Sequence, residues 1–196
     1  MRISKRVFDI IASFFGLIVL SPLLIAIAAI IRIRMSRPVF FRQQRIGRQG
    51  KPFTIYKFRT MILNHNGGTV SVLGDNRITP LGAKLRRYKL DELPELWNVL
   101  IGDMSFVGPR PDMPEYIEKL TGEEKLILEL RPGITGPATL KYANEEKILA
   151  SKNDPKEYND KVLWPDKVRI NLKYYKTQSF FGDISLIVRT IFGSTK

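Results

Sequence analysis

Two adjacent carboxylates, Asp91 and Glu92, are the first side chains of this sequence that could do chemistry. They follow three basic residues, and we expect them to open a helix. A positive helix end and nearby guanidinium groups would lower the pKa of Asp91 and keep it ionised. An ionised Asp can attack phosphorus or bind Mg²⁺. On the dipeptide alone, an ordinary helix N-cap is the commoner interpretation.

Two arginines lie in stiff, proline-containing segments. Arg110 stands between two prolines, which fix φ on both sides and pre-position its guanidinium for bidentate phosphate binding. A surface turn that happens to contain Arg explains the same residues equally well. Arg131 opens the segment Arg131-Pro132-Gly133-Ile134-Thr135-Gly136, whose glycines would let backbone N–H groups approach an anion.

The composition excludes several other kinds of site. The 196 residues contain no cysteine and one histidine, His65, so thiolate nucleophiles, Cys-ligated metals and multi-histidine metal sites are excluded. No Walker loop and no G-x-G-x-x-G fingerprint is present. With 44% hydrophobic and 26% charged residues, the chain has the balance of a globular protein. Chemistry must therefore use carboxylates, hydroxyls, Lys, Arg or the backbone.

The net charge of +13 is concentrated at the amino-terminal end. Residues 1–60 hold 12 Lys/Arg and a single acid, Asp9. Such a block attracts a polyanion, which is either nucleic acid or an anionic membrane face. We find no nucleic-acid-binding module and expect no nucleic acid among the partners.

The uncharged run Ile10–Ile31 has 22 residues and would form a helix of about 33 Å, close to the bilayer core of about 30 Å. A cleaved signal peptide, a spanning helix and a re-entrant helix are the three interpretations. The run is too long for a signal peptide, whose apolar core has about 7–15 residues. Ser21 and Pro22 lie at its midpoint, where proline kinks a helix, and arginines flank both ends, which favours two cytoplasmic ends. From these residues alone, a spanning helix and a re-entrant helix remain about equally supported.

The elements that must position the candidate residues form one domain behind this anchor. Two short strands, Pro38–Gln43 and Pro52–Phe58, would make a basic β-hairpin next to the membrane. Thr79-Pro80 reads as a helix start and Gly102 as a helix stop. Further helices are expected over Pro114–Leu130, Asn144–Lys152, Pro155–Val162, Lys167–Tyr175 and Asp183–Phe192.

Taken together, the motifs resemble the bacterial sugar transferase family, the monotopic phosphoglycosyl transferases that begin lipid-linked glycan assembly. The resemblance rests on ordered segments, each weak alone: Phe41-Arg42-Gln43, Ile55-Tyr56-Lys57-Phe58-Arg59-Thr60-Met61, Leu90-Asp91-Glu92-Leu93-Pro94, Trp97-Asn98-Val99-Leu100, Gly102-Asp103-Met104-Ser105-Phe106-Val107-Gly108-Pro109-Arg110-Pro111 and Arg131-Pro132-Gly133-Ile134-Thr135-Gly136. It covers nearly all of the chain up to Gly136 and weakens beyond it. The polar stretch Tyr142–Trp164 matches no generic motif of the family.

The resemblance implies an α+β, mostly helical fold in two parts. Residues 1–36 would be a re-entrant membrane helix broken at Ser21-Pro22. Residues 37–196 would be a cytosolic catalytic domain with the hairpin and amphipathic interfacial helices, integrated with the anchor. The expected location is the cytoplasmic face of the bacterial inner membrane.

The resemblance also implies a reaction. A sugar-1-phosphate passes from a UDP-sugar to a polyprenyl (undecaprenyl) phosphate with release of UMP, as the first membrane step of glycoconjugate synthesis. Carried over residue by residue, Asp91 is the covalent nucleophile and Glu92 its partner, and both are candidate Mg²⁺ ligands. Arg110, Arg86 and Arg131 are the candidate phosphate-binding residues. Membrane lipids and other glycan-pathway enzymes are the further partners expected.

Two rival functions fit parts of the sequence. A membrane-tethered basic binding protein would explain the charge of residues 1–60, but attraction to lipid headgroups explains it as well. A glycosyl transferase acting on the same substrates would release UDP instead of UMP. The sequence leaves the sugar, the polyprenyl chain and the oligomeric state open.

Overall fold

The computed structural model describes residues 3–63 and 74–193, so His65 lies outside the described residues. The helices are α1 (Ile3–Met35), α2 (Pro80–Arg87), α3 (Glu95–Ile101), α4 (Pro114–Ile117), α5 (Pro137–Lys141), α6 (Glu145–Ala150), α7 (Pro155–Tyr158), α8 (Trp164–Thr177) and α9 (Phe180–Gly193). The strands are β1 (Phe40–Ile46), β2 (Pro52–Phe58), β3 (Ser105–Val107) and β4 (Gly133–Thr135). Short 3₁₀ segments are η1 (Arg48–Gly50), η2 (Leu90–Glu92) and η3 (Gly122–Glu129), and η4 (Asn159–Leu163) is a π-turn.

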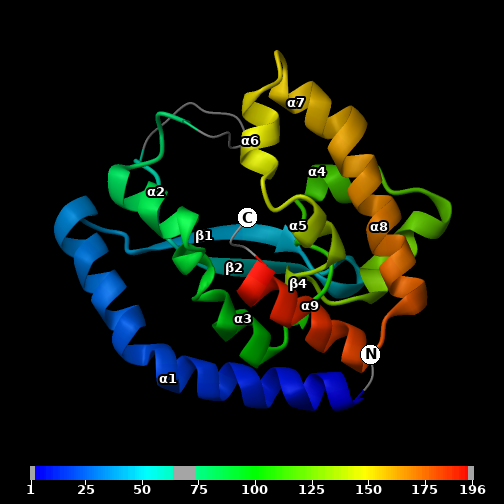
Figure 1. Cartoon of the computed structure of the whole chain (residues 1–196), viewed down its shortest axis with the longest axis horizontal. Helices are drawn as coiled ribbons and strands as arrows, with labels where there is room; N and C mark the ends of the chain where they lie inside the picture. Colours follow the sequence, from blue (N-terminus) through cyan, green and yellow to red (C-terminus); the bar gives the residue numbers. More distant parts are fainter. Residues whose placement is uncertain (1–2, 64–73, 194–196) are drawn as a thin grey trace.

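Helix α1 is long and apolar enough to cross a membrane by length and composition. It is one continuous helix, so the break expected at Ser21-Pro22 is not observed, although Figure 1 shows a bend near its middle. Pro22 has no N–H to donate to the carbonyl of Ile18, four residues earlier. The hydroxyl of Ser21 donates to that carbonyl instead, at 2.7 Å. A side chain thus satisfies the acceptor that proline leaves, which lets the helix continue.

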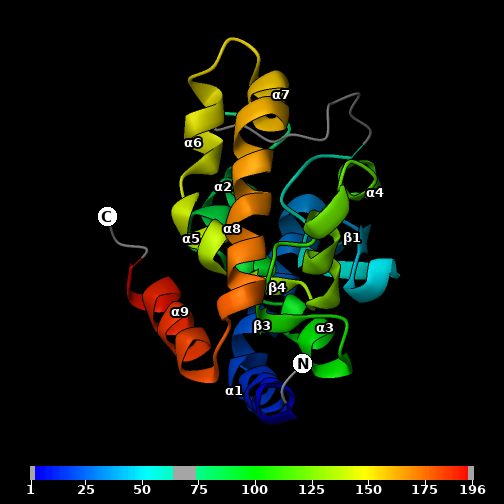
Figure 2. The same cartoon turned by 90° about the vertical axis from the view of Figure 1, so that its right-hand side faces the viewer.

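The second half of α1 packs onto the body of the protein. Ile27 and Ile31 are buried in one cluster with Phe58 of β2 and Leu85 of α2. The first half runs along α3 and α9, at the edge of the molecule opposite α6 and α7 (Figures 1 and 2). The anchor helix is therefore part of the hydrophobic core and not a detached tail.

Strands β1 and β2 pair antiparallel, with Phe40 opposite Phe58 and Gln43 opposite Ile55. Strand β2 has the predicted bounds, whereas β1 begins two residues later and ends three residues later than expected. Ile55 packs on Val99 and Met104, which fixes β2 against α3. This contact places β2 directly beside the carboxylates that precede α3.

Strands β3 and β4 form a small parallel pair within segments for which no strand was predicted. A Cβ on Gly133 would lie 2.1 Å from the amide nitrogen of Gly108, so glycine is required where the two backbones touch. The amide of Gly133 donates to the carbonyl of Pro109 at 2.8 Å. The N–H of Gly133 is therefore used in the fold and is not free for an anion.

The carboxyl-terminal half differs from the prediction in several elements. Helix α5 was not predicted, and the helices expected over Pro155–Val162 and Lys167–Tyr175 form one contiguous run of α7, η4 and α8. The single helix expected over Pro114–Leu130 is interrupted after α4, and η3 begins at Gly122, which has a left-handed φ of 48°. Leu120 and Ile127 pack beneath Val168 of α8. Figure 2 shows α8 as the long helix that runs beside α5 and α6, with α7 at its upper end.

Candidate active site

Asp91 lies in the short turn η2, between the end of α2 and the start of α3. Lys89 precedes the turn in a left-handed conformation, with φ of 55°. Helix α3 begins at Glu95, after Pro94, so the expectation that a helix opens at Asp91 is wrong. The N-cap interpretation of Asp91 also fails, since Lys89 and Pro94 occupy the two N-cap positions.

The carboxylate of Asp91 is buried and only partly satisfied. The residue is 8% exposed, and its Oδ1 has no hydrogen-bond partner among the described residues. Burial, followed by the charge of Glu92, raises the pKa of Asp91, while nearby cations including Lys57 and Arg86 act in the opposite direction. The expected lowering of this pKa is therefore wrong, because the loss of solvent outweighs the cations.

Glu92 is the anion at the centre of an ion-pair network. Its Oε1 accepts hydrogen bonds from Lys57 Nζ at 2.7 Å and from Arg110 Nη2 at 2.8 Å. Burial opposes ionisation, but Arg110, Lys57 and Lys89 outweigh it and hold the pKa of Glu92 well below its usual value. Arg110 keeps its other face in solvent, with 44% of its side chain exposed. A guanidinium in this position can bind a phosphate while Glu92 orients it.

Glu95 completes the network from the first turn of α3. Its Oε1 lies 3.0 Å from Lys57 Nζ, and the residue is 2% exposed. Burial raises the pKa of Glu95 to about 7, although Lys57 favours the charged form. Lys57 thus lies between two carboxylates of different proton affinity.

Arg86 approaches Asp91 from α2. Its Nε donates to Thr60 Oγ1 at 3.0 Å, and its Nη1 donates to Glu146 Oε1 at 2.9 Å. Helix α2 comes this close because Gly82 lies on the backbone of Thr60, where a Cβ would be 2.0 Å from the carbonyl oxygen. The start of α2 is as predicted, with Thr79 Oγ1 accepting from the amide of Gly82 at 2.9 Å.

The comparisons with known proteins agree with this geometry. The sequence profile described as "Bacterial sugar transferase" matches residues 1–196. The chain belongs to the bacterial sugar transferase family. It is a transferase by this assignment, as the motifs predicted.

Three relatives illustrate the range of this family. The chain is 35% identical to the "Uncharacterized sugar transferase EpsL" of Bacillus subtilis, over 96% of this chain and 86% of the relative. It is 36% identical to the "UDP-glucose:undecaprenyl-phosphate glucose-1-phosphate transferase" of Escherichia coli, over 97% of this chain and 40% of the relative. It is 33% identical to the "UDP-N-acetylgalactosamine-undecaprenyl-phosphate N-acetylgalactosaminephosphotransferase" of Aeromonas hydrophila, over 95% of this chain and 42% of the relative. The chain thus spans about two fifths of the length of the last two.

In this sugar transferase, four of the residues singled out in the sequence lie together: Asp91, Glu92, Arg86 and Arg110. Arg131 lies elsewhere. Its Nε donates to the carbonyl of Gly102 at 2.7 Å, beyond the other end of α3. Burial lowers the pKa of Arg131, and the like charges of Arg6 and Arg48 lower it further. The structure therefore places Arg131 in a different group of charges from Asp91.

Sequence reasoning missed Lys57 and Glu95. Lys57 lies two positions from the buried Ile55, on the strand face that contacts α3. The alternation of side chains along a strand places Lys57 on the same face as Ile55, so the sequence alone could have indicated a cation at an inward position. Glu95 follows Asp91 by four residues, but only the burial of α3 distinguishes it from a surface glutamate.

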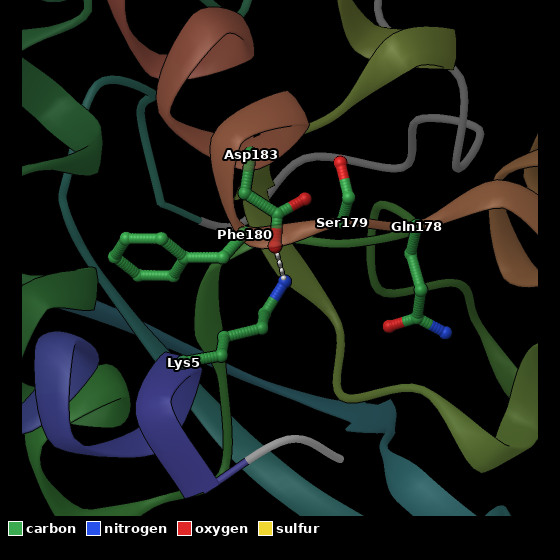
Figure 3. A pocket seen from close by; sticks show the side chains of 5 residues that line it. All are labelled: Lys5, Gln178, Ser179, Phe180 and Asp183. Atoms are coloured by element: carbon green, nitrogen blue, oxygen red, sulfur yellow. Dashed lines mark hydrogen bonds and ion pairs between the residues drawn. The ribbon is translucent and has the colours of Figure 1, made fainter.

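Two cavities lie away from Asp91. One is a small pocket at the start of α9, where Figure 3 shows the ammonium of Lys5 pointing at the carboxylate of Asp183. This ion pair, at 2.6 Å, ties the beginning of α1 to α9. The other, of about 390 Å³, adjoins it and is lined by Lys5, Arg48 and Arg131 among others.

Proposed function

We propose that this sugar transferase moves a sugar-1-phosphate from a UDP-sugar to a polyprenyl phosphate and releases UMP. The observation that carries the proposal is Asp91, a buried carboxylate with one unpartnered oxygen among the cations Lys57, Arg86 and Lys89. The names of the relatives support the substrate classes, since they include UDP-sugars and undecaprenyl phosphate. Those names differ in the sugar, so the proposal leaves the sugar open.

The reaction would take two displacements at one phosphorus atom. An oxygen of Asp91 attacks the sugar-linked phosphorus, and the bond from that phosphorus to the bridging oxygen breaks. UMP leaves with the bridging oxygen and the electron pair, and a phosphosugar ester of Asp91 remains. A phosphate oxygen of the polyprenyl phosphate then attacks the same phosphorus and releases the carboxylate. Burial suits this role, because a poorly solvated carboxylate is a stronger nucleophile.

The cations would bind and orient the phosphates. Arg110 is half exposed and held at one end by Glu92, so it can present its free edge to a diphosphate. Arg86 would neutralise charge from the opposite side of Asp91. Phosphoryl transfer gains mainly from positioning and from such neutralisation, so no further acid or base is needed.

The donor set around Asp91 fits Mg²⁺. The cation prefers carboxylate oxygens together with phosphate oxygens, and Asp91 Oδ1 is a hard oxygen with no other partner in the described part of the chain. Glu92 is the second candidate ligand, although its Oε1 already accepts hydrogen bonds from Lys57 and Arg110. These carboxylates would hold the ion with the substrate phosphates, and when bound it would neutralise charge on them. No group of three or more His, Asp or Glu side chains occurs in residues 3–63 and 74–193 that could hold a metal alone.

The site belongs at a membrane surface because one substrate is a lipid. The apolar helix α1 supports membrane association, and arginines at both of its ends support a re-entrant path with both ends on the cytoplasmic face of the inner membrane. The bend at Pro22 and the hydroxyl of Ser21 fit such a path, because each half of the helix reaches only part of the way across.

Release of UMP is the experiment that tests the proposal. Purified full-length protein in detergent, with Mg²⁺ and a polyprenyl phosphate, is given a panel of UDP-sugars beside the nearly isosteric Asp91→Asn variant. We expect UMP from at least one sugar and at least a 10³-fold loss in the variant, the order seen when a nucleophile is removed.

The alternatives give different products. Release of UDP would identify a glycosyl transferase and remove the proposed role of Asp91. Absence of product from every nucleotide sugar in the panel would favour the non-catalytic tether. UMP release that persists in Asp91→Asn would keep the reaction but exclude Asp91 as the nucleophile. Removal of Mg²⁺ by a chelator should stop turnover, and unchanged turnover would exclude the metal.

A further inference from the structure

Two arginines from distant parts of the chain meet at the carboxyl-terminal end of α3. Arg6 donates to the carbonyls of Val99 and Leu100, at 2.7 and 2.9 Å. Arg131 donates to the carbonyl of Gly102. A Cβ on Gly102 would lie 3.0 Å from Nη2 of Arg6 and 3.9 Å from Nη2 of Arg131, so the two guanidinium groups are neighbours. The helix end, with its exposed carbonyls, attracts both.

Arg48 brings a third guanidinium to this group. Its Nε donates to the backbone carbonyl of Glu129 at 3.0 Å. It forms no ion pair with a carboxylate in the described part of the chain. The charges of Arg6 and Arg48, after burial, lower the pKa of Arg131, which is the effect of crowded like charges. An anion among these groups would relieve the crowding.

The cavity beside them is large enough for such an anion. Its volume of about 390 Å³ falls within the range of ligand pockets. Four cations line it, namely Lys5, Arg48, Arg131 and Lys176, against one carboxylate, Glu129. Tyr175 already donates to that carboxylate at 2.6 Å.

The four cations are not equivalent. Lys5 pairs with Asp183, at 2.6 Å, and Lys176 pairs with Glu123, at 2.9 Å. Arg48 has no such pair, so its charge is the least compensated of those on α1, η1 and α8 that face the cavity.

Exposed apolar side chains are close in sequence to residues that line this cavity or the adjoining pocket, or that bind its arginines. Ile3, on the same helix as Lys5, is 83% exposed, and Phe181, at the start of α9, is also 83% exposed. Ile101, beside Gly102, is half exposed. Cations next to exposed apolar side chains fit a molecule with an anionic head and an apolar tail, as in the basic pockets that bind lipid headgroups.

We propose that this cavity binds the phosphate group of an anionic membrane phospholipid, with Arg48 and Arg131 as its principal contacts. The site is separate from the candidate active site, because Asp91 precedes the amino-terminal end of α3 and the arginines gather at the opposite end. It requires membrane association but not the transferase reaction. Arg131 would then bind phosphate, as its sequence motif predicted, but on a lipid that does not react.

Native mass spectrometry of the full-length protein in neutral detergent tests the proposal. The detergent is doped with phosphatidylglycerol or with phosphatidylcholine, and retained lipids are counted. We expect one retained phosphatidylglycerol and no comparable retention of phosphatidylcholine. Arg48→Gln should weaken retention about tenfold, as expected for the loss of one charge-assisted hydrogen bond.

Matched variants keep the test specific. Lys51→Gln removes the same charge from an exposed side chain three residues away and should leave retention unchanged. Arg48→Lys keeps the charge and should lose less than Arg48→Gln. If Arg48→Gln lowers Tm, Lys176→Gln gives the same test from the other wall of the cavity.

Four results would overturn the proposal. Equal retention by Arg48→Gln and wild type, or equal losses in Arg48→Gln and Lys51→Gln, would leave only general attraction to the basic residues 1–60. Displacement of phosphatidylglycerol by equimolar inorganic phosphate would identify a free-phosphate site. Displacement by polyprenyl phosphate in the same assay would assign the cavity to the substrate lipid.

Discussion

At the scale of single residues, the candidate site combines carboxylates whose pKa values are shifted in opposite directions. Glu92 is held ionised by Arg110 and Lys57, whereas Glu95, on the other side of Lys57, has its pKa raised to about 7 by burial. Burial also raises the pKa of Asp91. The site therefore keeps one carboxylate occupied with cations and leaves Asp91 available for chemistry.

The raised pKa of Glu95 predicts how stability depends on pH. The folded protein keeps a proton on Glu95 up to about pH 7, whereas the unfolded chain releases it near the ordinary glutamate pKa of 4.5. The free energy of unfolding should therefore fall by up to ~3 kcal/mol as pH rises between these values. Glu95→Gln, which cannot ionise, should lack this loss when Tm is measured across pH by circular dichroism.

A surface carboxylate provides the control for this measurement. Glu118 is exposed, and Glu118→Gln should keep the pH dependence of the wild type. A Glu95→Gln protein whose Tm falls with pH as steeply as that of the wild type would contradict the assignment.

Much of the site could be predicted from residue types, but its charge state could not. The motifs identified Asp91, Glu92, Arg86 and Arg110, which the fold brings together. The direction in which the pKa of Asp91 shifts depends on burial, which the spacing of neighbouring residues does not reveal. The position of Arg131 could not be predicted for a related reason, because distance along the chain does not say which end of α3 its side chain contacts.

At the scale of elements, α2 depends on one glycine for its position. Gly82→Ala would place a Cβ 2.0 Å from the carbonyl oxygen of Thr60. Relief requires α2 to move away, and Arg86 moves with it. We expect a loss of ~1–3 kcal/mol in stability, as in overpacked cores, together with reduced UMP release.

Gly193 provides the comparison, since nothing lies within 4 Å of the Cβ that alanine would add there. Gly193→Ala should leave Tm and turnover unchanged. A Gly82→Ala protein with wild-type Tm would mean that α2 is not packed on the backbone of Thr60.

The path of α1 can be tested with cysteine chemistry because the chain contains no cysteine. Ser4 and Ser36 are exposed residues at the two ends of the helix. For a re-entrant helix, single Ser4→Cys and Ser36→Cys variants in intact bacteria should both resist a membrane-impermeant maleimide. Both should react once the inner membrane is permeabilised. Labelling of Ser4→Cys in intact cells would instead demonstrate a spanning helix.

The elements that the sequence predicted well have strong local signals. The Thr79-Pro80 helix start, the bounds of β2 and the stop at Gly102, with φ of 99°, each depend on a few neighbouring residues. The pair β3 and β4 was missed because its strands have three residues each and join only through distant backbone contacts. The interruption between α4 and η3 was missed because the expected helix ran across Gly122, whose left-handed φ of 48° is set by the folded backbone.

At the scale of the whole molecule, the anchor and the catalytic body share one core. Ile27 and Ile31 of α1 are buried against Phe58 and Leu85. Removal of residues 1–36 would expose that apolar surface. We expect the truncated protein to aggregate or to lose cooperative unfolding, as judged by size-exclusion chromatography and a thermal melt in the same detergent. A monomeric truncation with a sharp transition would establish an independent domain 37–196.

The buried pair of Lys5 and Asp183 joins residues 178 positions apart. A ribosome adds about 5–20 residues each second, so Asp183 leaves the peptidyl transferase centre roughly 9–36 s after Lys5. During that interval the lysine of α1 has no carboxylate from α9 with which to pair. Helix α9 therefore closes the structure that α1 begins, and this ion pair can form only once Asp183 has been synthesised.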